Sequence, residues 1–188
     1  MAIFIFGHIY RYRTDQFHWT AKSSEFIEKK QLMIGSILFH LGIIPVILGH
    51  VSGLGIPKSW LHAVGVNDHL YHIGAIYVGG FFGFMTLLGM IILTFRRFTI
   101  RSVRMLSSAS DLVVNSLLLF IVFMGMYATL VTNVVQPEFD YRSSISVWFR
   151  DLFFLRPDPA LMSGVPMSFK IHVLAGFAIF ALWPFTRL

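Results

Sequence analysis

Four long apolar segments dominate this chain of 188 residues. The hydrocarbon core of a bilayer is crossed by about 20 apolar residues in a helix. The segments cover residues 32–51, 71–95, 112–135 and 169–186, and each approaches or exceeds that length. Residues 1–10 (MAIFIFGHIY) are also apolar but supply only about half a crossing. We therefore expect an all-α integral membrane bundle of five transmembrane helices, the first one truncated, in a chain cut at both ends.

The composition supports the same class. Hydrophobic residues make up 56% of the chain and charged residues only 13%, against about 25% charged in soluble proteins. Residues 1–188 therefore form a single membrane domain, and any chemistry needs a cofactor or a partner subunit. The chain has no Cys, which excludes iron–sulfur ligation, c-type haem attachment, disulfides and thiol catalysis by this chain.

The basic residues orient the helices. They gather in two connections, 11–31 and 96–111, and the positive-inside rule places such connections in the cytoplasm. They are Arg11, Arg13, Lys22, Lys29 and Lys30 in the first and Arg96, Arg97, Arg101 and Arg104 in the second. We expect a multi-pass protein of the cell (cytoplasmic) membrane with its amino end outside. The net charge of +6 thus reflects topology and does not indicate nucleic-acid binding.

The connection at residues 136–170 contains one further candidate element. Residues 143–160 (SSISVWFRDLFFLRPDPA) mix aromatic and basic residues before a Pro-Asp-Pro stop. This pattern is typical of a short amphipathic helix in the outer membrane interface. An ordinary ordered loop is an equally good interpretation.

Three histidines lie within the apolar segments. His40 and His50 share one segment and His172 lies near the start of the last. A histidine at membrane depth is costly unless it is paired or bound. In the expected topology His50 and His172 lie at the same depth, so we predict that they clamp one metal between two helices. His40 lies about 15 Å deeper and needs another partner, either a residue beyond Leu188 or His8.

Haem is the cofactor that best suits two facing imidazoles in a helical bundle. Small residues beside the ligands would let the macrocycle approach the backbone, and Gly42, Gly49 and Gly176 occupy such positions. The alternative without a cofactor is that the histidines are buried and hydrogen-bonded and that the glycines only pack helices. His69 and His72 flank the outer start of a helix, where an imidazole could take a proton from a quinol. Interfacial histidines without a substrate are an equally good interpretation.

Three segments carry a resemblance to a known family. They are RYRTDQFHWTAKSSEFIEKK (11–30), LFHLGIIPVILGHVSGL (38–54) and FKIHVLAGFAIFALWPFTRL (169–188). The chain resembles, over essentially its whole length, the gamma subunit of membrane-bound respiratory nitrate reductase, a dihaem cytochrome b. The segments QPEFDYR and RPDPALMSGVP are similar to those of Gram-positive members.

The resemblance implies two b-type haems. The outer one would lie between His50 and His172. The inner one would use His40 and a second histidine beyond Leu188, which favours truncation over His8 and leaves the inner haem incomplete in this chain.

The resemblance also implies the reaction. Menaquinol or ubiquinol would be oxidised near the outer haem, and electrons would pass to an iron–sulfur subunit and a molybdenum catalytic subunit that reduces nitrate in the cytoplasm. Gly49 matches a position of the family's quinol pocket. Tyr71 and His72 occupy the region where some members have a lysine, so the residue that takes the quinol proton stays open.

Two other functions compete with electron transfer. A proton or metal transporter would also use histidines within the membrane, but the cores of the four long segments contain no Asp, Glu or Lys. A purely structural anchor with incidental histidines is the second alternative. A reduced-minus-oxidised absorbance spectrum separates all three, because only a cytochrome is coloured.

Overall fold

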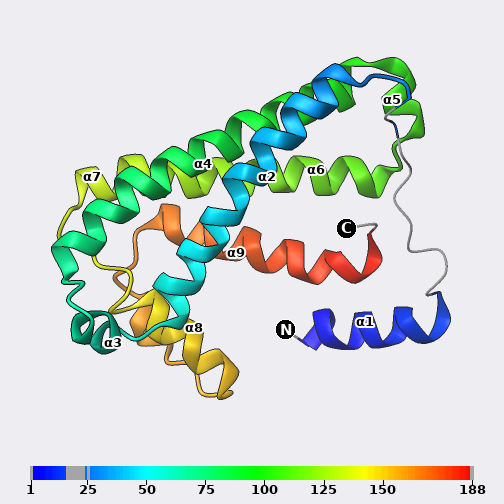
Figure 1. Cartoon of the computed structure of the whole chain (residues 1–188). Coiled ribbons are helices and arrows are strands. Elements are labelled where there is room, and N and C mark those ends of the chain that lie inside the picture. The colour runs from blue at the N-terminus through cyan, green and yellow to red at the C-terminus, as the bar shows by residue number, and fades with distance from the viewer. Residues whose placement is uncertain (1, 16–23, 25, 187–188) are drawn as a thin grey trace.

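The computed structural model describes residues 2–15, 24 and 26–186, and every regular element in that part of the chain is a helix. Four helices are long and apolar enough to cross a membrane: Lys30–Gly55, Asp68–Thr99, Ala109–Val135 and Met167–Phe185. Helix α1 (Ala2–Thr14) lies against the end of the last one (Figure 1). The predicted all-α membrane bundle is therefore confirmed.

The crossings are built from a few long helices and two π-helical turns. The long helices are α2 (Lys30–His50), α4 (Asp68–Thr99), α6 (Ala109–Tyr127) and α9 (Met167–Leu182). The π-helical turns η2 (Val51–Gly55) and η3 (Ala128–Thr132) extend α2 and α6. The short elements are α3 (Lys58–Ala63), α5 (Arg101–Leu106), α7 (Asn133–Val135), α8 (Ile145–Phe153), η4 (Pro159–Met162) and η5 (Trp183–Phe185).

Local sequence signals explain where two crossings begin. The side chain of Asn67 accepts a hydrogen bond from the Leu70 N–H and caps α4. Ser108 and Asp111 form a reciprocal capping box at the start of α6, in which each side chain bonds the backbone N–H of the other. These caps satisfy N–H groups that have no partner within the helix. Helices α4 and α6 therefore begin close to the boundaries that the sequence predicted.

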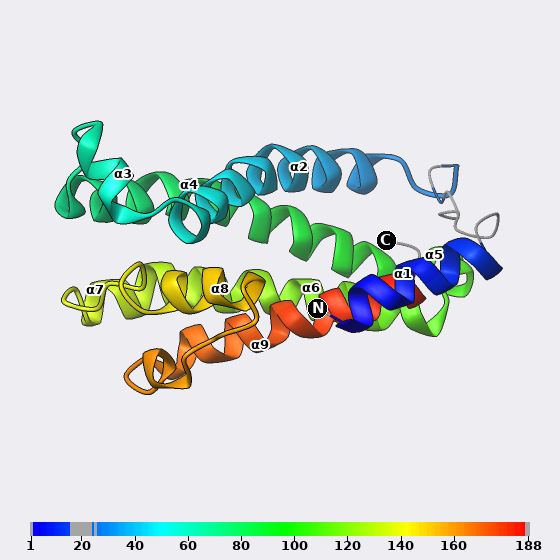
Figure 2. The same ribbon diagram turned by 90° about the horizontal axis from the view of Figure 1, so that it is seen from below.

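The connections predicted to share one side do meet at one end of the bundle. Arg96 of α4 binds Glu28, and Arg11 of α1 donates to the carbonyls of Pro184 and Thr186. We call this the basic end. At the opposite end Lys58 and Arg142 bind carboxylates of other segments. Figure 2 shows α5 at one end of the molecule and α3 and α7 at the other, as alternating crossings require.

Glycines bring α2 and α4 into close contact. A Cβ atom added to Gly42 would lie 2.6 Å from the Thr86 backbone nitrogen and 2.7 Å from the Phe82 carbonyl oxygen. One added to Gly89 would lie 2.8 Å from the Gly35 carbonyl oxygen. Small residues allow helix backbones to approach closely in a membrane, where packing replaces the hydrophobic effect. The α2–α4 pair is thus fixed by residues that have no room for a side chain.

Helix α8 confirms the short helix predicted within residues 143–160. It is held against the end of the α2 crossing by two side chains. Ser146 donates to the Gly53 carbonyl at 2.6 Å, and Arg150 donates to the Leu54 carbonyl at 2.9 Å. Carbonyls at the end of a helix lack partners within the helix. Helix α8 therefore supplies hydrogen-bond donors to carbonyls at the end of η2. Its place in the membrane interface stays a prediction.

Arg96 fastens the connection before α2 to the end of α4. Its side chain is buried, and its guanidinium donates to the Glu28 carboxylate at 2.9 Å and the Ser24 hydroxyl at 3.0 Å. It also donates to the Ser24 and Glu28 carbonyls. One planar guanidinium thus donates to four oxygen atoms of Ser24 and Glu28.

Arg96→Ala is expected to lower the thermal unfolding midpoint by roughly 5 to 10 °C, because the half-buried acceptors of Ser24 and Glu28 lose their buried donor. Intrinsic tryptophan fluorescence in detergent measures the midpoint. The matched control is Arg101→Ala, an exposed arginine in the same connection. Equal midpoints for the two variants would contradict this role of Arg96.

Candidate functional site

The structure brings together two of the predicted ligands, His50 and His172. His50 is the last residue of α2, and His172 lies in the second turn of α9. Their ring centres are 6.0 Å apart and the ring planes are inclined by 34°. The two rings therefore lie side by side, and their joint binding of a metal stays a prediction. We call this pair the paired-histidine site.

Hydrogen bonds fix the tautomer of both rings. The Nδ1 atom of His50 lies 2.8 Å from the Val46 carbonyl oxygen, and Nδ1 of His172 lies 3.0 Å from that of Ile121. A carbonyl only accepts hydrogen bonds, so Nδ1 carries the proton in each ring. The Nε2 atom of each neutral imidazole then keeps its lone pair and can bind a metal.

Two of the three predicted glycines border open space near the site. A Cβ atom added to Gly49 or to Gly176 meets no atom within 4 Å, so a planar cofactor could approach the backbone at both. Gly42 does not fit this prediction, because its open face is filled by Thr86 of α4. Gly42 instead packs α2 against α4, which is the alternative role given above for these glycines.

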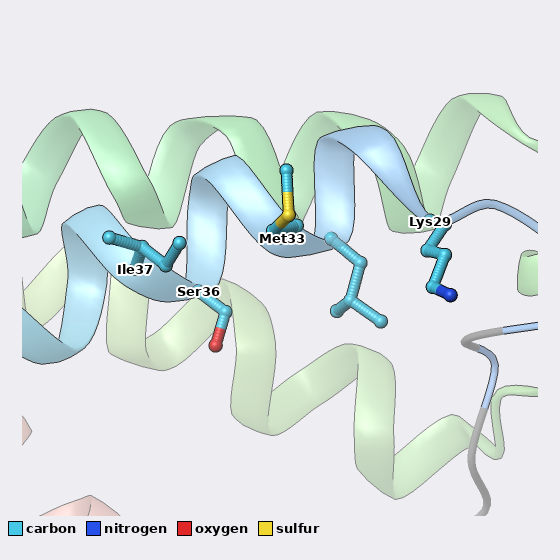
Figure 3. Close-up of a pocket in the computed structure, with 5 residues that line it drawn as sticks. Lys29, Met33, Ser36 and Ile37 are labelled. Carbon is cyan, nitrogen blue, oxygen red and sulfur yellow. The ribbon is translucent and has the colours of Figure 1, made fainter.

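His40 lies on α2, the helix that also carries His50. Its Nδ1 atom is 2.7 Å from the Ser36 carbonyl oxygen and 3.2 Å from the Ser36 hydroxyl. Ser36 also lines a cavity of about 280 Å³ along this helix. Figure 3 shows Lys29, Met33, Ser36 and Ile37 around it, and Leu32 completes the lining. His40 therefore has the same ligand-ready tautomer as His50 and His172, and the residue that holds it, Ser36, lines this cavity.

His8, the alternative inner ligand, lies on α1 with its ring 4.4 Å from that of Phe4. Its Nδ1 atom is 2.7 Å from the Phe4 carbonyl oxygen. Because Phe4 in turn contacts Phe180 and Trp183, His8 belongs to the packing of α1 on the end of α9.

A pair of tyrosines lies against the segments that follow His50 and precede His172. The hydroxyls of Tyr71 and Tyr141 are 2.8 Å apart. Gly53 lies three residues after His50, and a Cβ atom added to it would collide with both hydroxyls. The Tyr141 ring also stacks on Phe169, three residues before His172, with 6.1 Å between ring centres. Tyr141 thus connects the segments that follow and precede the two histidines.

A buried arginine supports this tyrosine pair. The guanidinium of Arg142 lies 3.9 Å from the centre of the Tyr71 ring and donates to Asp68 at 2.7 Å and to Asp140 at 3.3 Å. Asp140 also pairs with Lys58. Among the residues that the structure describes, the buried Nη1 atom of Arg142 has no hydrogen-bond partner.

Two groups next to Arg142 in the chain, Tyr141 and Asp140, have shifted pKa values. Burial and the neighbouring Tyr71 raise the pKa of the Tyr141 hydroxyl well above its usual value. Burial also acts to raise the pKa of Asp140, but hydrogen bonds from Lys58 and Arg142 outweigh it and the net pKa is lowered. Tyr141 therefore stays neutral and Asp140 stays ionised at physiological pH.

Of the three residues predicted for a quinol pocket, only Tyr71 is in this tyrosine pair. Gly49 borders open space, and His72 is half-buried one residue further along α4. Tyr141 and Arg142 were missed by the sequence analysis as individual residues. Their only signal was the segment QPEFDYR, which contributed to the family resemblance as a whole.

The spacing of the two rings in the paired-histidine site suits a haem held by two imidazoles. Two imidazoles on opposite sides of one metal, each with its nitrogen at about 2 Å, hold their ring centres roughly 6 Å apart. A bare ion needs more protein ligands, and the described residues contain no group of three or more His, Cys, Asp or Glu suited to a metal. A porphyrin supplies the remaining ligands itself.

Comparison with known proteins agrees with a multi-pass helical membrane protein of this kind. The family model for the nitrate reductase gamma subunit matches residues 1–188. The nitrate reductase gamma chain of Bacillus subtilis is 47% identical over 188 residues, which are all of this chain and 84% of that one. The chain belongs to the nitrate reductase gamma subunit family.

Two further relatives show how widely the sequence is shared. The respiratory nitrate reductase 2 gamma chain of Escherichia coli is 32% identical over all of this chain and 82% of its own length. The nitrate reductase-like protein NarX of Mycobacterium tuberculosis is 43% identical over all of this chain, which spans 29% of that protein. The higher identity to the Bacillus subtilis chain fits the predicted Gram-positive type.

Proposed function

We propose that this chain is the membrane anchor and quinol-oxidising cytochrome b subunit of a respiratory nitrate reductase. It would deliver electrons to a cytoplasmic iron–sulfur subunit and from there to a molybdenum subunit that reduces nitrate. The observation that carries the proposal is the paired-histidine site, where two imidazoles on different helices face each other at 6.0 Å between ring centres. Membership of the nitrate reductase gamma subunit family supports the choice of complex.

His50 and His172 would together hold one b-type haem, and His40 would supply a ligand to a second. When bound, these two haems accept single electrons and so connect a two-electron quinol donor with one-electron carriers. The protein would orient each imidazole through its Nδ1 hydrogen bond and present Nε2 to the iron. Gly49 and Gly176 would leave room for the macrocycle.

Charge supports an orientation of the subunit across the membrane. The basic end carries the exposed residues Lys29, Lys30, Arg101 and Arg104, and the positive-inside rule places such an end in the cytoplasm. The paired-histidine site then lies toward the outer face and His40 toward the inner face. Electrons would travel inward to the partner subunits, and the protons of quinol would leave on the outside.

The Tyr71–Tyr141 pair is the candidate route for the quinol protons. A phenol both donates and accepts hydrogen bonds, and the pair adjoins the segments of both ligands. The raised pKa of Tyr141 keeps this hydroxyl neutral, so it would relay a proton without ionising. Gly49 and His72 remain candidate members of the same quinol pocket.

Tyr71→Phe is expected to slow quinol oxidation by roughly 10- to 100-fold, because one hydroxyl of the relay is lost. The haem spectrum should not change. The measurement is oxidation of a reduced quinol analogue by membranes that contain the intact complex. Tyr77→Phe is the control, since Tyr77 lies on the same helix with its side chain 73% exposed. Rates that do not differ between the two variants would remove Tyr71 from the mechanism.

A reduced-minus-oxidised absorbance spectrum of the purified complex tests the proposed function. A b-type haem signal that quinol reduces and nitrate reoxidises is the expected result. A colourless subunit would contradict the proposal and favour the structural anchor. A colourless subunit that carries protons or metal ions across vesicles would favour the histidine-lined transporter.

A further inference from the structure

The Nδ1 hydrogen bond of His172 differs from those of the other two proposed ligands. His40 and His50 each bond the carbonyl four residues earlier in their own helix, α2. His172 instead reaches the carbonyl of Ile121, which belongs to α6. The orientation of the His172 ring therefore depends on how α6 packs against α9.

Gly125 brings the same face of α6 against the His172 ring. A Cβ atom added to Gly125 would lie 2.9 Å from Cε1 and 3.3 Å from Nδ1 of His172. Gly125 lies one turn after Ile121, so both contacts lie on one face of α6. Any side chain at position 125 would have to displace the ring and strain its bond to Ile121.

A second contact holds α6 and α9 together one turn away. The hydroxyls of Thr132 and Ser168 are both buried and lie 2.7 Å apart. Ser168 is four residues before His172, and Thr132 is the last residue of the π-helical turn η3. Such turns occur frequently at functional sites. Helix α9 is thus held by α6 at His172 and, one turn earlier, by η3 at Ser168.

We propose that α6 is a third wall of the paired-histidine site, in which Gly125 and the Ile121 carbonyl are positioning residues for His172. This inference rests on the proposed function, because it assumes that a haem iron binds Nε2 of His172. A hydrogen bond from Nδ1–H makes an imidazole a stronger electron donor to its metal. Helix α6 would in this way hold down the midpoint potential of the haem at this site.

Gly125→Ala in the intact complex tests the inference. We expect the midpoint potential of one haem to rise and its low-spin EPR signal to move, while the other haem keeps both values. The affinity of the altered site for haem should fall by about 10- to 100-fold. Potentiometric titration followed by absorbance and EPR gives these readings without turnover. Phe123→Leu is the matched control, because Phe123 lies on the same helix with its side chain 52% exposed.

Each outcome decides between the inference and its alternatives. Two unchanged haems, or two that shift equally, would overturn the role of α6 and leave the proposed function intact. Wild-type complex without haem would overturn the proposed function itself. If Gly125→Ala fails to fold, the density of the haem-bound wild-type complex decides: Nδ1 of His172 should lie at about 3 Å from the Ile121 carbonyl oxygen, and an Nδ1 bonded elsewhere would overturn the inference.

Discussion

Replacing either His50 or His172 by alanine is expected to remove one and the same haem from the intact complex and to abolish nitrate reduction with quinol. Each variant takes away one of the two imidazoles proposed to hold a single haem, and the remaining imidazole alone would not keep a low-spin haem in place. Because the ring centres are only 6.0 Å apart, loss at either position should give the same spectrum. Haem content and EPR of purified complex measure the result.

The control is His69→Ala, an exposed histidine at the start of α4, which should retain both haems. Reduction of nitrate by an artificial dye that bypasses the membrane subunit should survive in all three variants. The account would be contradicted if His50→Ala and His172→Ala removed different haems, since the two residues would then serve separate irons.

Gly89→Val is expected to prevent normal assembly of α2 on α4. A Cβ atom at Gly89 would meet the Phe39 backbone nitrogen and lie 2.8 Å from the Gly35 carbonyl oxygen. Backbone atoms cannot rotate away as a side chain can, so the two helices must separate. Forced overpacking of this kind typically costs about 1 to 3 kcal/mol and occasionally more. Thermal unfolding in detergent and the yield of assembled complex measure the effect.

Gly79→Val is the matched control on the same helix, because a Cβ atom there meets nothing within 4 Å. We expect this variant to unfold within a few degrees of the wild type and to retain its haem. If both glycine variants assembled equally well, close backbone contact would not be what holds α2 against α4.

The fold and the close approach of His50 to His172 could be predicted because each follows from a strong local signal. Apolar runs of membrane length predict helices, and basic connections predict which ends lie together. Once those are fixed, the positions of His50 and His172 along their helices decide that they lie at one depth. The close approach of their rings then needs only that the end of α2 comes near the start of α9.

The supporting residues could not be predicted because their roles depend on rotation about the helix axis and on packing between helices. The sequence does not show that Gly42 faces Thr86 while Gly49 and Gly176 border open space. It likewise cannot show that the Ile121 carbonyl, a group that every residue has, is the one that receives the His172 proton. Tyr141 lies in a connection without periodicity, so only the folded chain brings it to Tyr71.

The most direct test of the central claim is a density map of the intact complex with its cofactors. The account predicts one haem iron between His50 and His172, with Nε2 of each ring at about 2 Å from the metal. An iron bound by other side chains, or two facing imidazoles with no iron between them, would contradict it.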